Sequence, residues 1–120
     1  MRVAVVGSRG YPNEGLVRAF VRTLAARDPK TVIISGGARG VDTWAADEAR
    51  KAGLDVEEYL ADWDRLGRTA GFARNTTIVE QSDVVVAFHD GRSRGTLDTI
   101  RKTQGAGKRL FVLGPDSAPR

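Results

Sequence analysis

The segment that sets the architecture reads Thr31-Val32-Ile33-Ile34-Ser35-Gly36-Gly37-Ala38-Arg39-Gly40-Val41-Asp42. Its first half is a short β-branched apolar run, which predicts a buried strand. Its second half holds three glycines and an arginine, and an alanine-rich helical pattern begins at Asp42. Strand, glycine turn and helix are the layout of an anion-binding site, because glycines let the backbone approach a ligand and a helix start offers free N–H groups. The alternative is a tight connection whose glycines only satisfy the geometry of the turn.

Length and composition narrow the class of protein. The chain has 120 residues, so we expect one domain spanning 1–120 with a core of its own. It has no cysteine, which excludes disulfides and thiolate metal sites and favours a cytoplasmic location. The apolar run Val3–Val6 is too short for a signal peptide, and no run approaches the length needed to cross a membrane. His89 is the only histidine, so no cluster of ligands predicts a transition-metal site. No cofactor is predicted either.

The basic residues are scattered, and the formal net charge of +4 is modest. A nucleic-acid surface more often shows a basic stripe along one helix or face, so nucleic acid is not an expected partner. The arginines that fall in or beside predicted loops are Arg9, Arg39, Arg68, Arg74, Arg92 and Arg94. Their position suggests a small anionic ligand instead.

Strand and helix patterns alternate along the chain. Apolar runs predict strands at Arg2–Val6, Thr31–Ser35, Asp83–Phe88 and Arg109–Leu113, and Leu54–Leu60, which mixes apolar residues with three acids, predicts an edge strand with one exposed face. Helical spacing predicts helices between a cap at Asn13 and a stop at Asp28-Pro29, and over Val41–Ala52, Ala70–Gln81 and Thr96–Gln104. This alternation predicts an α/β fold, a Rossmann-like three-layer sandwich whose five-stranded parallel sheet has the order 3-2-1-4-5.

Glycine-containing loops follow the first, second and fourth predicted strands. They are Gly7-Ser8-Arg9-Gly10, Gly36–Gly40 and His89–Thr96. In the order 3-2-1-4-5 these three strands are neighbours, and ligands of such sheets bind at the carboxyl ends where the strand order reverses. We therefore expect the three loops to meet in one ligand-binding crevice.

Several common site motifs do not match the sequence. The first loop is Gly-x-x-Gly rather than Gly-x-Gly-x-x-Gly, and no GxxxxGK[ST] segment occurs, so ordinary dinucleotide and Walker-type sites are disfavoured. A hydrolase triad is disfavoured because no Gly-x-Ser-x-Gly is present. A polar loop is predicted over Ala61–Gly71, in which Trp63 either covers the core or forms the wall of a pocket. Asp62 and Asp64 there are interpreted as caps or loop acids.

Six short motifs, spread over nearly the whole chain, carry a resemblance to a known family. They are Gly7-Ser8-Arg9, Ser35-Gly36-Gly37-Ala38-Arg39-Gly40-Val41-Asp42, Ala61-Asp62-Trp63, Gly67-Arg68-Thr69-Ala70-Gly71, Arg74-Asn75 and Arg94-Gly95-Thr96. In combination they resemble the YspA/YpsA-related branch of the SLOG superfamily. That superfamily has a modified Rossmann fold and includes the Lonely Guy phosphoribohydrolases and the DNA-processing proteins of natural transformation. The resemblance implies binding of a nucleotide or nucleotide derivative rather than a defined reaction.

The same resemblance bears on catalysis. Lonely Guy enzymes carry a Pro-Gly-Gly-x-Gly-Thr-x-x-Glu segment, and aligning its Gly-Thr with Gly95-Thr96 puts Thr99 at the place of the catalytic glutamate. Asp98 stands one position earlier, and Arg74 matches an arginine of the hydrolases. The comparison implies that phosphate-binding parts are kept. It leaves Asp98 and Asp42 as the candidate catalytic carboxylates.

Three functions remain open from the sequence. The first is a nucleotide-binding domain that acts as sensor or carrier, with a small nucleotide-like ligand at Gly7, Ser8, Arg9, Ser35, Gly36, Gly37, Arg39, Gly40, Asp42, Arg68, Arg74, Asn75, Gly95 and Thr96. In it, Asp42 caps its helix or binds ribose. The second is an N-glycosidase or phosphoribohydrolase acting on nucleoside monophosphates. The third is a single-stranded DNA-binding module. The oligomeric state is open, and pairing in relatives of this fold favours a homodimer.

Overall fold

A single parallel sheet organises residues 1–115, which are the residues that the computed structural model describes. Its strands are β1 (Arg2–Gly7), β2 (Val32–Ser35), β3 (Asp55–Glu58), β4 (Val84–Phe88) and β5 (Arg109–Leu113). They are ordered β3-β2-β1-β4-β5, and every neighbouring pair is parallel. The predicted fold class and strand order are therefore confirmed.

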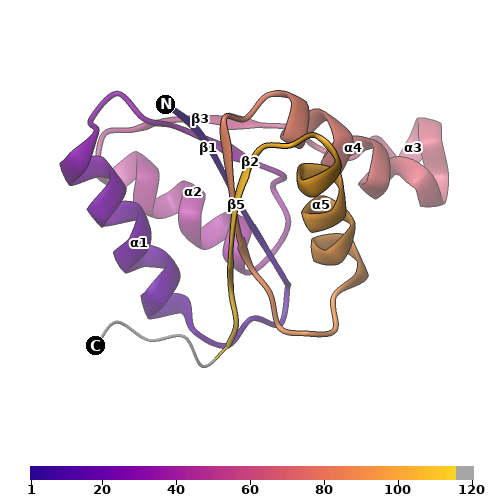
Figure 1. Ribbon diagram of the computed structural model, residues 1–120, viewed down its shortest axis with the longest axis horizontal. Coiled ribbons are helices and arrows are strands. Elements are labelled where there is room, and N and C mark those ends of the chain that lie inside the picture. Colours follow the sequence, from indigo (N-terminus) through magenta and orange to yellow (C-terminus); the bar gives the residue numbers. More distant parts are fainter. Residues whose placement is uncertain (116–120) are drawn as a thin grey trace.

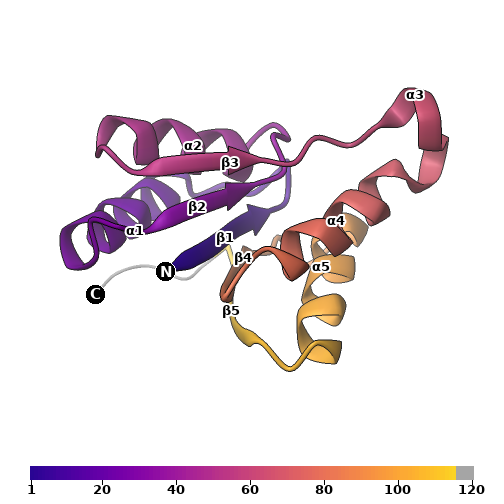
Figure 2. The same ribbon diagram turned by 90° about the horizontal axis from the view of Figure 1, so that it is seen from above.

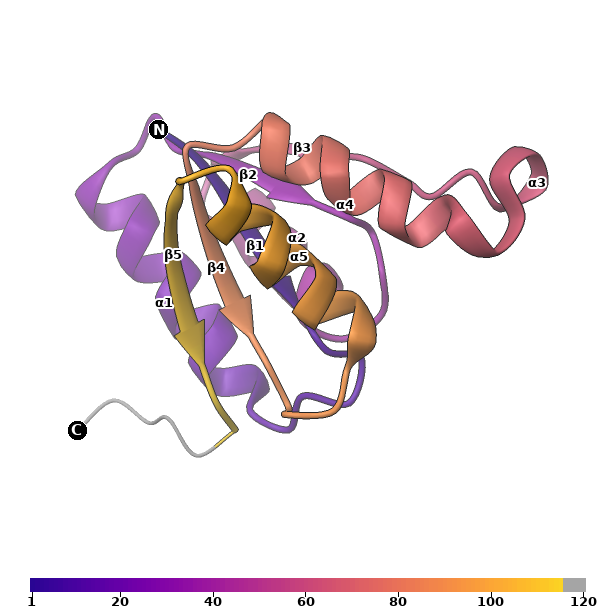
Figure 3. The same cartoon turned by 45° about the vertical axis from the view of Figure 1, so that its right-hand side comes forward.

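Helices cover both faces of the sheet, which gives the predicted three layers. Helices α1 (Glu14–Arg27) and α2 (Val41–Lys51) lie on one face (Figures 1 and 2). Helices α4 (Ala70–Glu80) and α5 (Arg94–Gly105) lie on the other, side by side in Figure 3. Among residues 1–115 no helix combines the length and the apolar character needed to cross a membrane.

The core follows the alternation of side chains along the strands. In β1, Val3 and Val5 are buried with residues of α1 and α2, whereas Ala4 and Val6 are buried with residues of α4 and α5. Every residue of β4 is buried, because helices cover both of its faces. The sheet thus holds the carboxyl ends of β1, β2 and β4 at one rigid edge.

Side-chain caps set where two helices begin. The side chain of Asn13 accepts a hydrogen bond from the Leu16 amide at 3.1 Å, as the predicted cap of α1 should. Helix α5 begins at Arg94, two residues earlier than predicted, because Ser93 Oγ accepts a hydrogen bond from the Thr96 amide at 3.2 Å.

The predicted loop over 61–71 is wrong in part, because it contains two helical turns. Helix α3 (Trp63–Leu66) is capped by Asp62, whose Oδ1 accepts from the Arg65 amide at 3.1 Å. It ends at Gly67, where φ is +56°, and the 3₁₀ turn η1 (Gly67–Thr69) leads into α4. A four-residue helix with no buried residue has no hydrophobic periodicity for a sequence to display. In Figures 1–3 this segment projects away from the sheet beyond the end of β3.

Candidate functional site

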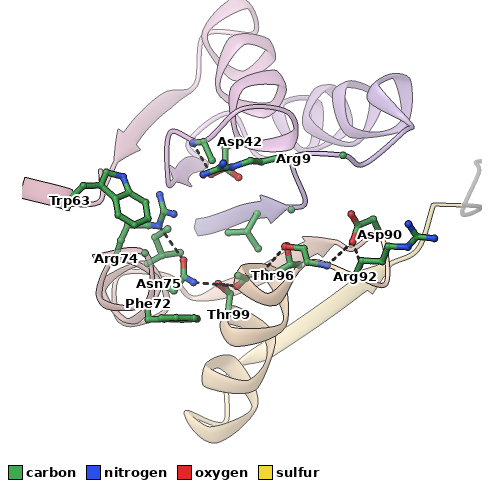
Figure 4. A pocket seen from close by; sticks show the side chains of 18 of the residues that line it. Arg9, Asp42, Trp63, Phe72, Arg74, Asn75, Asp90, Arg92, Thr96 and Thr99 are labelled. Carbon is green, nitrogen blue, oxygen red and sulfur yellow. Dashed lines mark hydrogen bonds between the residues drawn. The ribbon is translucent and has the colours of Figure 1, made fainter. Parts of the chain in front are cut away.

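A cavity of about 460 Å³ lies at the carboxyl ends of the central strands. Its wall comes from the loops after β1, β2 and β4 together with α3, η1, α4 and the start of α5. Strand order reverses at β1, whose neighbours are β2 and β4, so the cavity occupies the place where parallel sheets usually bind ligands. In Figure 4, Arg9 and Asp42 face Thr96 and Thr99 across it. The three glycine loops are therefore brought together at one cavity.

Two glycines let the first two loops approach each other closely. A Cβ on Gly7 would lie 2.6 Å from the Phe88 carbonyl oxygen and equally close to the Val41 side chain. A Cβ on Gly40 would lie 2.8 Å from the Arg9 carbonyl oxygen, and Gly40 also has a φ of +79°. These glycines are needed for packing at the cavity wall, and only Gly7 lines the cavity itself.

Hydroxyl groups fasten the first loop to the third. Ser8 is fully buried, and its Oγ accepts a hydrogen bond from the Asp90 amide at 3.1 Å. The same Oγ lies 3.3 Å from Thr96 Oγ1, which also lies 3.0 Å from Ser93 Oγ. Asp90 Oδ1 accepts from the amides of Arg92 and Ser93, and these two bonds lower the pKa of Asp90. The start of α5 is thus fixed against β1.

Asp42 is a carboxylate buried in the cavity wall, 5% exposed. Burial raises its pKa to about 6, although the amide of Ala38 and the charge of Arg74 act in the opposite direction. Its Oδ2 accepts a hydrogen bond from the Ala38 amide at 3.2 Å. Asp42 therefore binds the loop before α2 rather than capping α2, whose N-cap is Gly40 without a side-chain bond. The capping role considered from the sequence is wrong.

Arg74 joins α4 to the loop after β2. Its Nη1 donates to the Gly36 carbonyl at 2.5 Å and its Nε donates to Asn75 Oδ1 at 3.2 Å. A Cβ on Gly36 would lie 2.7 Å from Arg74 Nη1 and 2.9 Å from Asp42 Oδ2, so only glycine leaves room for both charged groups. Burial lowers the pKa of Arg74, and the charge of Arg9 lowers it further while Asp42 raises it.

Asn75 extends this network to α5. Its Nδ2 donates to the Gly95 carbonyl at 3.2 Å and to Asp98 Oδ2 at 3.1 Å. Asp98 Oδ2 also accepts from Lys102 Nζ at 2.8 Å, and Asp98 does not line the cavity. Thr99 does line it, at the position where the aligned enzymes carry glutamate. Of the two carboxylates considered for catalysis, only Asp42 faces the cavity.

The structure divides the sequence-predicted binding residues into two groups. Eight line the cavity: Gly7, Arg9, Asp42, Arg68, Arg74, Asn75, Gly95 and Thr96. Six do not: Ser8, Ser35, Gly36, Gly37, Arg39 and Gly40. Ser35 Oγ accepts from the Gly37 amide at 3.2 Å and so shapes the turn. A Cβ on Gly37 would point at Leu60 and Glu58, away from the cavity, and Arg39 is exposed outside it.

Sequence reasoning missed several lining residues. Phe72, whose helical spacing with Ile78 and Val79 predicts a packing role, is instead 46% exposed and lines the cavity. Trp63, left open between core and pocket wall, lines the cavity and is 53% exposed. Asp90 and Ser93 stand in the sequence only as parts of a glycine loop, whereas Arg92 is one of the loop arginines that suggest an anionic ligand; all three line the cavity. The sequence feature that could have identified these residues as part of the site is their position between a strand and a helix, which the other two glycine loops share.

The chain matches one protein-family model and is similar to a phage protein. The model of the YAcAr family, described as the YspA, cpYpsA-related SLOG family, matches residues 1–66. The Gene 61 protein of Mycobacterium phage D29 is 38% identical over 120 aligned residues, which cover 94% of this chain and 96% of the phage protein.

Solved structures show the same architecture. DNA processing protein A (DprA) from Streptococcus pneumoniae superposes with a TM-score of 0.78 at 24% identity, over 92% of this chain and 49% of that protein. DprA from Helicobacter pylori, whose structure was solved to describe its single-stranded DNA binding mode, superposes with a TM-score of 0.72 at 26% identity. The match covers 93% of this chain and 64% of that protein. The protein TM1055 superposes with a TM-score of 0.74 at 25% identity, over 91% of this chain and 71% of that protein. The chain thus spans about half the length of the first DprA and 64% of the second.

Proposed function

Because the chain belongs to the YspA, cpYpsA-related SLOG family, we propose that it binds a nucleotide or nucleotide-derived phosphate ligand in this cavity, as a sensor or carrier. The observation that carries the proposal is the charge of the wall. Four arginines line the cavity, namely Arg9, Arg68, Arg74 and Arg92, against the two carboxylates Asp42 and Asp90. The excess of positive charge favours an anion.

The placement of Arg74 strengthens this argument. Its guanidinium is half-buried, which disfavours its charge. The Asp42 carboxylate offsets part of this cost and Arg9 adds to it, so an anion bound between the two guanidinium groups would stabilise both. Within residues 1–115 its Nη2 donates to no acceptor, which leaves N–H groups for a phosphate. The exposed side chain of Arg9 can move toward the same anion.

The size and composition of the cavity also suit a nucleotide. Small-molecule sites commonly enclose about 300–1,000 Å³, with apolar walls and a few polar groups that set orientation. Here Val6, Ile78, Trp63 and Phe72 supply apolar surface beside the arginines. The first turn of α5 adds backbone amides and a positive dipole end.

Single-stranded DNA binding is a second candidate. The likeness to H. pylori DprA favours it and argues against our expectation that nucleic acid is not a partner. A strand presents the same phosphate and base that a free nucleotide presents, so the same arginines and aromatic side chains suit it. The basic residues are scattered rather than arranged in a stripe, which favours a free nucleotide over a DNA strand as the ligand.

The glycosidase alternative has less support. Such a reaction needs a carboxylate near the ribose ring, where positive charge develops. Thr99 is neutral at the aligned position, and the Asp98 carboxylate is bonded to Asn75 and Lys102 outside the cavity. Asp42 faces the cavity, but its bond to the loop before α2 gives it a structural role.

Isothermal calorimetry tests the proposal with two matched arginine variants. We expect at least one ribonucleoside 5′-monophosphate to bind wild type, and Arg74→Ala to weaken binding about 10- to 100-fold, the usual cost of losing a charged hydrogen bond. Arg39→Ala removes an exposed arginine outside the cavity and should leave the Kd unchanged. Equal affinity of wild type and folded Arg74→Ala would refute the proposal. Binding of a short oligothymidylate alone, with steep salt dependence, would favour the DNA candidate.

A further inference from the structure

We infer that Trp63 and Phe72 form a nucleobase subsite in the cavity, an inference that rests on the nucleotide binding proposed above. Six large hydrophobic side chains are exposed among residues 1–115, and Trp63 and Phe72 are the two of them that line the cavity. Both lie near the join of α3 and α4, and Figure 4 shows them at the same end of the cavity. Their exposure is thus concentrated at one place instead of scattered over the surface.

Local structure holds the Trp63 indole in the cavity wall rather than in the core. Helix α3 buries none of its residues, and the Asp62 cap and Gly67 fix its two ends. A Cβ on Gly71 would lie 3.4 Å from Trp63 Cη2, so the indole lies directly against the first turn of α4. Gly71 has no positive φ, so contact with the indole is the feature that a larger side chain there would disturb. A ligand that covers this ring gains the free energy of removing it from water.

Phe72 is held in a comparable way. The Lys102 ammonium lies 5.7 Å from the centroid of its ring, and Lys102 Nζ donates to the Phe72 carbonyl at 2.6 Å. Lys102 is itself held by Asp98 at 2.8 Å. The ammonium therefore favours this position of the ring, which stays almost half exposed. An aromatic ring with few alternative positions stacks on a ligand at lower entropic cost.

The aromatic side chains are confined to one end of the cavity, whereas its cationic groups run along it. Figure 4 shows Trp63 and Phe72 at one end together with Arg74, Arg92 beside Asp90 at the opposite end, and Arg9 between the two ends. A ligand that satisfies both ends carries a planar ring and an anionic group joined by a spacer. Nucleoside phosphates have this arrangement, whereas a sugar phosphate leaves the aromatic end uncovered. Because every base has a π face, the subsite selects nucleotides as a class.

The test compares ligands with and without a base. We propose measuring Kd by calorimetry for ribose 5-phosphate and for the four ribonucleoside 5′-monophosphates. In wild type the preferred nucleotide should bind about 5- to 100-fold more tightly than ribose 5-phosphate, the range expected for stacking of one base. Trp63→Ala should bring this ratio close to one, and Trp63→Phe should restore part of it. Trp44→Phe, in a half-buried residue of α2 outside the cavity, should keep the wild-type ratio.

The outcomes separate this inference from the proposal on which it rests. In the Trp44→Phe background Trp63 is the sole tryptophan, and its fluorescence should be quenched by the nucleotide but not by ribose 5-phosphate. Equal affinity of wild type for both kinds of ligand would overturn the inference alone. An equal loss of both affinities in Trp63→Ala would do the same. If none of these ligands binds, the proposed function fails, and the inference fails with it.

Discussion

Asp42 offers the most quantitative prediction, because it is a carboxylate buried in the cavity wall. Burial raises its pKa from 3.8 to about 6 in the folded protein. Between these values the folded protein holds a proton that the unfolded chain has released. The free energy of unfolding should therefore fall as the pH rises from about 4 to about 6, and this contribution should be constant above that window.

The size of the effect follows from the two pKa values. At about 1.4 kcal/mol per pH unit, moving the pKa from 3.8 to about 6 corresponds to about 3 kcal/mol. Asp42→Asn removes the titrating group and keeps its shape. The free energy of unfolding of the variant minus that of wild type should therefore rise by about 3 kcal/mol between about pH 3 and pH 7. A constant difference from altered hydrogen bonds does not affect this slope.

Urea denaturation followed by circular dichroism across this pH range measures the difference. Asp64→Asn, in an exposed residue of α3 outside the cavity wall, is the matched control for removing one carboxylate. Some carboxylates have lowered pKa values and the opposite pH dependence, but they are common to all three proteins: Asp28, Asp47, Glu57 and Asp90. If the free energies of unfolding of wild type and Asp42→Asn change in parallel with pH, the pKa of Asp42 is not raised in the folded protein.

Three further predictions concern binding, stability and catalysis. Gly36→Ala should weaken nucleotide binding about tenfold or more by calorimetry, because the new Cβ would lie 2.7 Å from Arg74 Nη1 and displace that side chain. Gly105→Ala is the control and should leave binding unchanged, because a Cβ at Gly105 has no atom within 4 Å. Asn75→Ala should lower the free energy of unfolding by about 1–3 kcal/mol in urea, since the Gly95 carbonyl and the Asp98 carboxylate each lose one of their donors; an unchanged midpoint would show that these bonds are unimportant. Wild type incubated with AMP should release no free adenine by chromatography, because Asp98 does not line the cavity and Asp42, which does, is bonded to the Ala38 amide; release that is lost in Asp98→Asn or in Asp42→Asn would establish the glycosidase instead.

The sheet could be predicted from the sequence because its signals are local and strong. Most strands are apolar runs, as in Val84–Phe88, although β3 reads Asp-Val-Glu-Glu, and the first helix begins at its predicted cap, Asn13. Strict alternation then leaves few topologies, and the order 3-2-1-4-5 brings the loops after β1, β2 and β4 together. The convergence of the loops at one cavity follows from the fold rather than from any single motif.

The roles of individual residues could not be predicted in the same way. Gly36 and Gly37 are neighbours in sequence, yet one lies against Arg74 and Asp42 while the other points toward the β3 side. Such differences depend on how the turn is closed by contacts with α4, which lies far along the chain. Phe72 has the helical spacing of a core residue, yet it is exposed on the first turn of α4. Patterns of type and spacing carry no information on these distances.

The central claim is that a nucleotide occupies the cavity, and the most direct test is a titration of ¹⁵N-labelled protein by NMR. Nucleoside monophosphates are added to millimolar concentration while the backbone amide signals are followed. The largest shifts should fall on amide signals of the cavity wall, such as those of Gly10, Gly71 and Gly95, while the signals of Gly53 and Gly107 should not move. If no signal shifts with any nucleotide, or if the largest shifts fall on Gly53 or Gly107, the nucleotide does not occupy the cavity.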